Sequence, residues 1–462
     1  MSSPHWLALL ATPRDLGSEP AAGTGPAVAS TRAAQMAQAA QAAEQEAALR
    51  ALGWWALQFT PRVARLEEAV VLEVGASLRL FGGLQRLHRR LWREARALGL
   101  SGMAWAPTSL GALALARAGQ HEGLARPLDE LLDALPLACL SAAQAHHAML
   151  LRLGCRRLGQ LRALPRRALG RRFGDGLLLA LDRAYGHSAE AHVWLQLPER
   201  FEARLELPFR IEHAPALLHY AESLLRQLCG WLAARQAGVK RLTLSWQHDA
   251  MRGRDVALDG ALQLGTAEPT REPRHLSRLL GEHLARLELA APVGELSLRA
   301  DEIMLKPEQA ASLLPSAPDE ATEALPQLLE RLSVRLGPAQ VRAGQLLEDH
   351  RMELMQRWQP WPGPARPAAA RPPLYPQPAW LLEPPLRLDA PRSQPRYLGQ
   401  PLQLLSRPQR VEGGWWAGQA GGPGLVQRDY VLAQSAQAGL LWIFQQRLSG
   451  EESAWFLHGV FA

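Results

Sequence analysis

The sequence predicts a multidomain α+β protein, and three observations support this prediction. The chain has 462 residues, 47% of them apolar, which is enough for two to four domains with their own cores. Strand-like and helix-like segments alternate up to residue 306, around one all-helical stretch. Twelve of the 35 prolines then fall between Pro360 and Pro395, which indicates an extended linker before a last ordered segment.

Residues 1–120 are expected to form one small layer of strands and helices. His5–Thr12 is a short apolar run typical of a buried strand, and the Ala- and Gln-rich segment Thr31–Leu52 favours a helix. The remaining elements are expected in this order: strands Trp54–Phe59 and Ala69–Val74 joined by a turn at Pro61, helix Leu84–Leu98, strand Gly102–Trp105 and helix Ser109–Arg117.

Residues 121–190 are expected to be helical, with short helices separated by Pro and Gly. Between Leu151 and Asp175 the segment carries eight arginines and one acid. Backbone amides at the glycine turns, next to arginines, suit contact with a phosphate backbone without reading bases. The alternative is a solvated, charged helical hairpin.

Residues 199–305 change character and alternate between strands and helices. The pattern predicts strands at Phe201–Ile211, Lys240–Gln247 and Gly294–Ile303 and helices at Ala214–Gln236 and Arg274–Leu289. One more strand after His248 completes a β-α-β-β-α-β order. Tryptophans and strand-like runs in 401–462 indicate a small β-rich module, with Trp415, Trp416, Trp442 and Trp455 mostly in its core.

Composition narrows the classes of function. A net charge of +7 and a pI near 9.9 favour an anionic partner such as nucleic acid. Of the 51 basic residues, 49 are arginines, and because a GC-rich genome produces the same bias, the net charge is given less weight. The three scattered cysteines indicate neither a disulfide framework nor a zinc site and fit a reducing cytosol. We expect no cofactor, no signal peptide and no membrane span, and the chain lacks GxxxxGK[ST], GxSxG and HExxH motifs.

Four stretches resemble the Y-family DNA polymerases, and most closely the ImuB group of polymerase-like accessory proteins in bacterial mutagenesis. They are Phe59–Val63 with Leu72–Gly83, Leu153–Leu161 with Arg171–Gly174, Pro198–Phe201 with Lys240–Leu244, and the C-terminal runs Arg410–Trp416, Arg428–Tyr430, Leu441–Phe444 and Trp455–Phe461. The resemblance implies a reduced palm (1–120) with the fingers mostly missing, a helical thumb (121–190), a little finger (199–305), a proline-rich linker carrying a clamp motif (306–400) and a partner-docking module (401–462).

The sequence departs from this family where a polymerase holds its metals. Polymerases transfer nucleotides with two divalent metals held by carboxylates from two palm strands. The first strand here contains no carboxylate, and Asp15 lies beyond it in an expected loop. Glu67 and Glu68 stand near the second position but are expected to be solvated turn residues. We therefore expect no catalytic and no metal-binding residues.

The resemblance also implies binding residues and partners. The expected contacts with DNA are Arg156, Arg157, Arg166, Arg167, Arg171 and Arg172 in the thumb and Lys240 and Arg241 in the little finger, with Arg204, Arg210, Arg271, Arg274 and Arg278 as further candidates. Gln309, Ser312, Leu313 and Leu314 resemble the bacterial sliding-clamp motif, in which a glutamine and an apolar pair fill a cleft as a linear peptide. Gln345–Leu347 and Gln403–Leu405 compete for this role.

The expected function is therefore that of a cytoplasmic, non-catalytic scaffold in error-prone translesion DNA synthesis during the DNA-damage response. The resemblance implies that it binds DNA and the β sliding clamp and recruits ImuA and an error-prone C-family DNA polymerase. Two alternatives remain open at this point: an active translesion polymerase that uses Glu67 or Glu68, and a basic DNA-binding protein without a clamp role.

Overall fold

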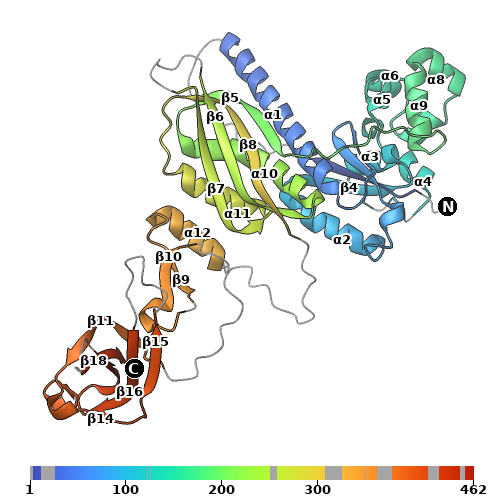
Figure 1. Cartoon of the computed structure of the whole chain (residues 1–462). Helices are drawn as coiled ribbons and strands as arrows, with labels where there is room; N and C mark the ends of the chain where they lie inside the picture. Colours follow the sequence, from blue (N-terminus) through green and yellow to red (C-terminus); the bar gives the residue numbers. More distant parts are fainter. Residues whose placement is uncertain are drawn as a thin grey trace. The chain divides into compact units, whose positions relative to one another are not determined.

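The computed structural model divides into two compact units, residues 1–331 and 332–462. The residues it describes are 4–11, 27–121, 123–124, 126–249, 257–306, 325–347, 349–361, 377–414, 426–447 and 453–461, with only the backbone described for 27–37. Figure 1 shows the helices and strands named below and labels many of them.

The first unit begins with a four-stranded antiparallel sheet in the order β2-β3-β1-β4. Its strands are β1 (Trp6–Ala11), β2 (Val63–Leu66), β3 (Ala69–Glu73) and β4 (Leu100–Ala106), and its helices are α1 (Ala27–Ala56), α2 (Leu84–Ala95) and α3 (Ser109–Arg117). The apolar β1 lies between β3 and β4, with Leu9 opposite Val70 and Met103. A central strand buried on both faces needs such a continuous apolar sequence, so the sequence prediction for this strand is confirmed.

One predicted strand of this layer is wrong. Trp54 to Ala56 form the last turn of α1, and the next three residues form a turn. Leu52, Trp55 and Ala56 are buried, and this helical spacing faces the core. The aromatic residues that suggested a strand therefore extend the helix, and the strand of the hairpin is β2, which begins after the turn at Pro61.

A helical subdomain follows and packs against α3 within one shared core. Its helices are α4 (Leu128–Asp133), α5 (Ser141–Gln144), α6 (His147–Arg152), α7 (Leu158–Arg162), α8 (Arg166–Phe173) and α9 (Asp175–Ala184), with a short 3₁₀ turn η3 (Leu137–Cys139). Gly154 and Gly174 have φ of 82° and 83°, a backbone region in which other residues are strained, so the turns before α7 and α9 need glycine. The all-helical prediction for this region is confirmed.

The third part of the first unit is a four-stranded antiparallel sheet covered by two helices. The strands are β5 (Glu202–Ile211), β6 (Ala237–His248), β7 (Asp259–Thr270) and β8 (Val293–Leu305), in the spatial order β5-β8-β6-β7, and the helices are α10 (Leu217–Ala234) and α11 (Pro273–Leu284). The strand expected after His248 is β7, so the predicted β-α-β-β-α-β order is confirmed. Helix α11 ends five residues before the predicted Leu289.

Helix α1 connects the first sheet to this third part, because it packs against α10 (Figure 1). The two backbones approach so closely that a Cβ on Gly230 would collide with the carbonyl of Ala51. Arg226 on α10 also forms an ion pair with Glu44 on α1, with both side chains largely buried. Among the described residues between β1 and β2, α1 is the one regular element, as the sequence predicts.

Helix α12 (Leu325–Leu336) crosses the division between the units, and its first half is held on the first unit. The buried Glu330 carboxylate lies 2.7 Å from His275 Nε2 and accepts a hydrogen bond of 2.6 Å from the amide of Ala267. The chain therefore leaves the third part at Lys306 and returns to it at Glu330.

The second unit is mostly β structure, as predicted. A hairpin of β9 (Arg342–Leu346) and β10 (Gln356–Pro360) precedes a sheet in the order β11-β18-β17-β16-β14, in which β15 also pairs with β16. The strands of this sheet and of a small β12–β13 pair are β11 (Trp380–Leu388), β12 (Arg396–Tyr397), β13 (Gln400–Pro401), β14 (Gln403–Leu404), β15 (Gln409–Gly413), β16 (Val426–Ser435), β17 (Gly439–Arg447) and β18 (Ser453–Val460).

The predicted linker is too long, because β11 belongs to this sheet. Its prolines Pro384 and Pro385 lie at a register irregularity of an edge strand, where no ladder hydrogen bond is lost. Trp442 and Trp455 are 5% and 8% exposed, which confirms their place in the core, whereas Trp415 and Trp416 lie outside the described residues.

Candidate functional site

The turn between β2 and β3 carries Glu67 and Glu68, the two carboxylates that stand nearest to the polymerase metal position. Both contact Arg117 in the last turn of α3: Glu68 accepts hydrogen bonds of 2.6 and 2.8 Å from Nε and Nη2, and Glu67 accepts one from Nη2. Arg117 Nη1 donates to the carbonyl of Cys139 at 2.9 Å. The guanidinium is therefore fixed between the turn and the helical subdomain.

Arg117 also decides the electrostatics of this corner. It holds the pKa of the Glu68 carboxyl below its usual range, so that carboxylate is ionised and already neutralised by a cation of the same chain. The adjacent strand β1 contributes only apolar side chains, and Asp15 lies outside the described residues. Within the described ranges, no group of three or more His, Cys, Asp or Glu side chains is arranged to hold a metal ion.

Glu73, the acid of the Leu72–Gly83 signature, has a structural contact. Its buried carboxylate accepts a hydrogen bond of 2.8 Å from the amide of Gly75 and one of 3.3 Å from Arg62. This arrangement closes the loop after β3, and each of the two carboxylate oxygens accepts a hydrogen bond within it.

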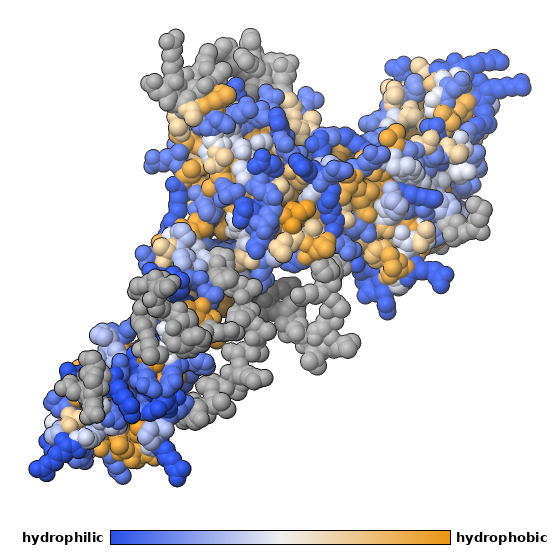
Figure 2. Space-filling view, viewed as in Figure 1, coloured by the Kyte–Doolittle hydropathy of each residue, from blue (hydrophilic) through white to orange (hydrophobic). Residues whose placement is uncertain are grey.

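The arginines predicted to contact DNA in the helical subdomain lie on its outside. Arg156 and Arg157 precede α7, and α8 carries Arg166, Arg167, Arg171 and Arg172; all six are exposed. Arg166 is neutralised by Asp182 through two hydrogen bonds of 2.8 and 2.6 Å. The other five have no ion-pair partner among the described residues, and hydrophilic side chains project from this end of the subdomain around α8 (Figure 2).

The predicted role for backbone amides at the first turn is wrong. Arg156 and Arg157 donate their amide protons to the side-chain oxygen of Gln160, at 2.7 and 3.2 Å. These amides cap α7 and are not directed at a ligand. Any contact with phosphate from this turn therefore comes from side chains.

The two little-finger residues lie in another setting. Lys240 is at a register irregularity of β6, and Arg241 lies 3.4 Å from Glu302. The strands of this sheet carry further carboxylates beside their basic side chains: Glu202, Glu206, Asp259, Glu295 and Asp301. The structure thus does not join Lys240 and Arg241 to the thumb arginines in one basic surface.

The further little-finger candidates divide by location. Arg204 and Arg210 form ion pairs with Glu202 and Asp249. Arg271 donates to the carbonyl of Lys306 at 3.2 Å. Arg274 and Arg278 lie on α11, on the helical side of the sheet.

The clamp-motif residues Gln309, Ser312, Leu313 and Leu314 lie outside the described residues. Their two competitors are described, and both belong to paired strands. Gln345 is in β9 opposite Arg357, and Gln403–Leu404 form β14 opposite Gln434 and Ala433. Because these segments use their backbone in a sheet, they are not free linear peptides.

Three of the C-terminal signatures, Arg428–Tyr430, Leu441–Phe444 and Trp455–Phe461, meet in one buried network of the second unit. Tyr430 stacks on Trp442 with ring centroids 4.1 Å apart, and its hydroxyl lies 2.8 Å from Nδ1 of His458. Arg428 links this hydroxyl to Glu353 through contacts of 3.2 and 2.9 Å. Burial lowers the pKa of His458 to about 4, so the ring is neutral near neutral pH. These signatures therefore build the core of the unit.

Comparison with known proteins places these features in a family. No protein-family model matches the chain. Two curated relatives from two strains of Caulobacter vibrioides, each named Protein ImuB, are 31% identical over 450 residues, which cover 91% of this chain and 94% of the relative. The chain belongs to the ImuB family. ImuB proteins are Y-family polymerase-like proteins, and their role is related to translesion DNA synthesis.

Solved structures similar to this ImuB-family chain are Y-family DNA polymerases. A ternary complex of Dbh is 16% identical with a TM-score of 0.28, covering 56% of this chain and 77% of that one. An insertion ternary complex of Dbh DNA polymerase is 12% identical with a TM-score of 0.29, covering 65% and 99%. DinB from Sulfolobus solfataricus is 14% identical with a TM-score of 0.26, covering 57% and 77%.

Sequence reasoning about this ImuB-family chain missed Arg117. The residue ends a helix that the sequence predicts correctly, but its contacts with the β2–β3 turn depend on the tertiary fold. It also missed Gln160, whose position three residues after Arg157 is the one signal of a helix cap. Among the described residues, no helix is long and apolar enough to span a membrane.

Proposed function

We propose that this protein is a non-catalytic scaffold of error-prone translesion DNA synthesis, which binds DNA and the sliding clamp and recruits ImuA and a C-family DNA polymerase. The observation that supports it best is the Arg117 corner. A polymerase needs two metals held by carboxylates from two strands. Here β1 supplies no carboxylate, and the guanidinium of Arg117 pairs with both carboxylates of the β2–β3 turn.

The proposed grip on DNA rests on the helical subdomain. Five exposed arginines without ion-pair partners among the described residues present side-chain charges to phosphates: Arg156, Arg157, Arg167, Arg171 and Arg172. Such contacts position a protein on nucleic acid without reading its sequence. Lys240 and Arg241 are secondary contacts, because carboxylates on the same sheet oppose a phosphate backbone.

The proposed clamp contact is a linear peptide centred on Gln309, Ser312, Leu313 and Leu314. The flanks support it: Lys306 donates its backbone amide to the Gln236 carbonyl at 2.8 Å, and α12 is held on the same subdomain through Glu330. In the sequence, the motif therefore falls between two segments that are held on the little finger. We place docking of ImuA and the C-family polymerase on the second unit and its linker.

The test measures clamp binding and primer extension on one preparation of the full chain. The variant Gln309→Ala/Leu313→Ala/Leu314→Ala is compared with Gln403→Ala/Leu404→Ala/Leu405→Ala as a matched control. We expect the first variant alone to lose clamp binding, and no protein to extend a primer with Mg²⁺ or Mn²⁺. Metal-dependent extension by the wild type would show an active polymerase, and clamp binding unchanged in the first variant would reject the clamp site.

A further inference from the structure

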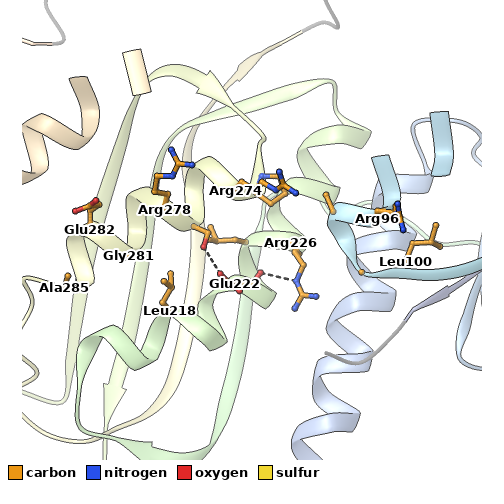
Figure 3. A pocket seen from close by; sticks show the side chains of 15 residues that line it. Arg96, Leu100, Leu218, Glu222, Arg226, Arg274, Arg278, Gly281, Glu282 and Ala285 are labelled. Atoms are coloured by element: carbon orange, nitrogen blue, oxygen red, sulfur yellow. Dashed lines mark hydrogen bonds between the residues drawn. The ribbon is translucent and has the colours of Figure 1, made fainter. Parts of the chain in front are cut away.

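A cavity of about 990 Å³ lies within the first unit, where the first sheet meets the helical side of the little finger (Figure 3). One wall comes from the segment between α2 and β4, including Arg96 and Leu100. The other walls come from α10 and α11, including Leu218, Arg274 and Arg278. Cavities at the junction of two subdomains are common binding sites.

The floor of this cavity is apolar. Leu100, Leu218, Leu225 and Pro273 line it, and Gly281 and Ala285 leave space along the same face of α11. No aromatic side chain lines it, so a nucleobase has no ring on which to stack. The floor favours an aliphatic group.

The rim of the cavity is basic. Arg274 and Arg278 are exposed and four residues apart on α11, so they lie on one face of the helix, and Arg96 is exposed on the opposite wall. Arg96 and Arg274 form no ion pair within the described part of the chain. Figure 3 shows Arg274 between Arg278 and the palm side of the cavity.

Apart from Arg96 and Arg274, the charged residues of the walls have partners within the chain. Glu222 accepts a hydrogen bond of 2.8 Å from Ser277, and Glu282 lies 3.6 Å from Arg331 of α12. Arg226 is paired with Glu44. The charges of Arg96 and Arg274 therefore have to be balanced by an occupant or by solvent ions.

We propose that this cavity docks a segment of a protein partner that presents carboxylates around an aliphatic anchor. The aliphatic side chain enters the floor, and the carboxylates contact Arg96 and Arg274. A helical segment fits a groove between two helices in this way, with anchors at every third or fourth position. Nucleic acid is disfavoured, because the floor is apolar and carries no aromatic ring on which a base could stack.

Such an occupant contacts both subdomains at once, since Leu100 belongs to β4, Arg96 lies in the turn before it, and Arg274 belongs to the little finger. None of the described lining residues belongs to α8. The inference therefore stands or falls independently of the proposed function.

The test uses the full chain and three labelled probes. The first is a short helical peptide with leucine at every third or fourth position and glutamate elsewhere; the second replaces glutamate by lysine; the third is a single-stranded oligonucleotide. We expect saturable binding of the glutamate peptide, measured by fluorescence anisotropy. Arg96→Glu/Arg274→Glu should weaken it by at least about tenfold, because two attractions become repulsions, and should favour the lysine peptide instead.

Two further variants separate the cavity from general charge. Ala97→Trp adds bulk to an exposed lining residue and should block the peptide while the arginines remain. Arg79→Glu/Arg89→Glu makes the same change in net charge outside the cavity and should leave binding unchanged. The proposal is overturned if the glutamate peptide does not saturate, if Arg96→Glu/Arg274→Glu does not weaken it, or if these changes abolish oligonucleotide binding instead.

Discussion

Replacing Arg167, Arg171 and Arg172 by alanine should reduce both the affinity for DNA and its dependence on salt. Each phosphate neutralised by a side chain contributes about 0.9 to the slope of log K against log salt on duplex DNA. Three lost contacts lower the slope by about 2.7. Between about 50 mM and about 200 mM salt, a fourfold range, the gap between wild type and variant should therefore narrow by about 40-fold.

The assay is fluorescence anisotropy with a labelled primer-template over that range of salt. Arg166→Ala is the matched control, because Arg166 lies on the same helix α8 but is already neutralised by Asp182. We expect the control to change the slope by well under 0.9, the value of about one contact. An unchanged slope in the triple variant, or an equal effect per residue in the control, would refute a phosphate contact by this helix.

Three other predictions concern the supports of the fold. Arg117→Met should lower the free energy of unfolding by about 2 kcal/mol in urea titrations, because it leaves two adjacent turn carboxylates unpaired, and it should not produce primer extension. Gly230→Val should cost about 2 to 3 kcal/mol because its side chain meets a carbonyl of α1, whereas Gly176→Ala, in open space on α9, should be neutral or slightly stabilising by calorimetry. Between neutral pH and pH 5, the second unit should lose about 2 kcal/mol of its free energy of unfolding. The pKa of His458 falls from 6.5 to about 4 on folding, so below pH 6.5 the unfolded chain takes up a proton that the folded chain does not. Trp442 fluorescence during unfolding measures this loss, and His458→Gln should flatten it.

The little finger was predictable because local signals and tertiary burial agree there. Residues of β5 and β6 alternate between apolar and polar, and α10 and α11 carry one apolar face each, so the order of elements follows from the sequence. The strand predicted at Trp54 is wrong because aromatic residues favour strands in general, whereas here they are buried as an extension of α1. The prediction missed strand β11 because its prolines suggest a linker, and the sequence does not show pairing at the edge of a sheet.

The candidate site was predictable only in part. The absence of a carboxylate in β1 and the cluster of arginines near α8 can be read directly from the sequence. The sequence does not show which arginine is neutralised, since Arg166 and Arg167 are neighbours and only Arg166 donates to Asp182. Arg117 is likewise 49 residues from Glu68 in sequence, and its role depends on how α3 is placed on the sheet.

The Arg117 corner also limits how this chain can change by mutation. Removing the guanidinium alone leaves Glu67 and Glu68 side by side with uncompensated charge. Adding a carboxylate to β1 alone, for example at the fully buried Ala8, places a charge in an apolar core at a cost of several kcal/mol. Neither single step is neutral, so a metal site could arise here only through coordinated changes on separate elements. The ion pairs of Arg117 thus oppose the acquisition of a metal site at this corner through single substitutions.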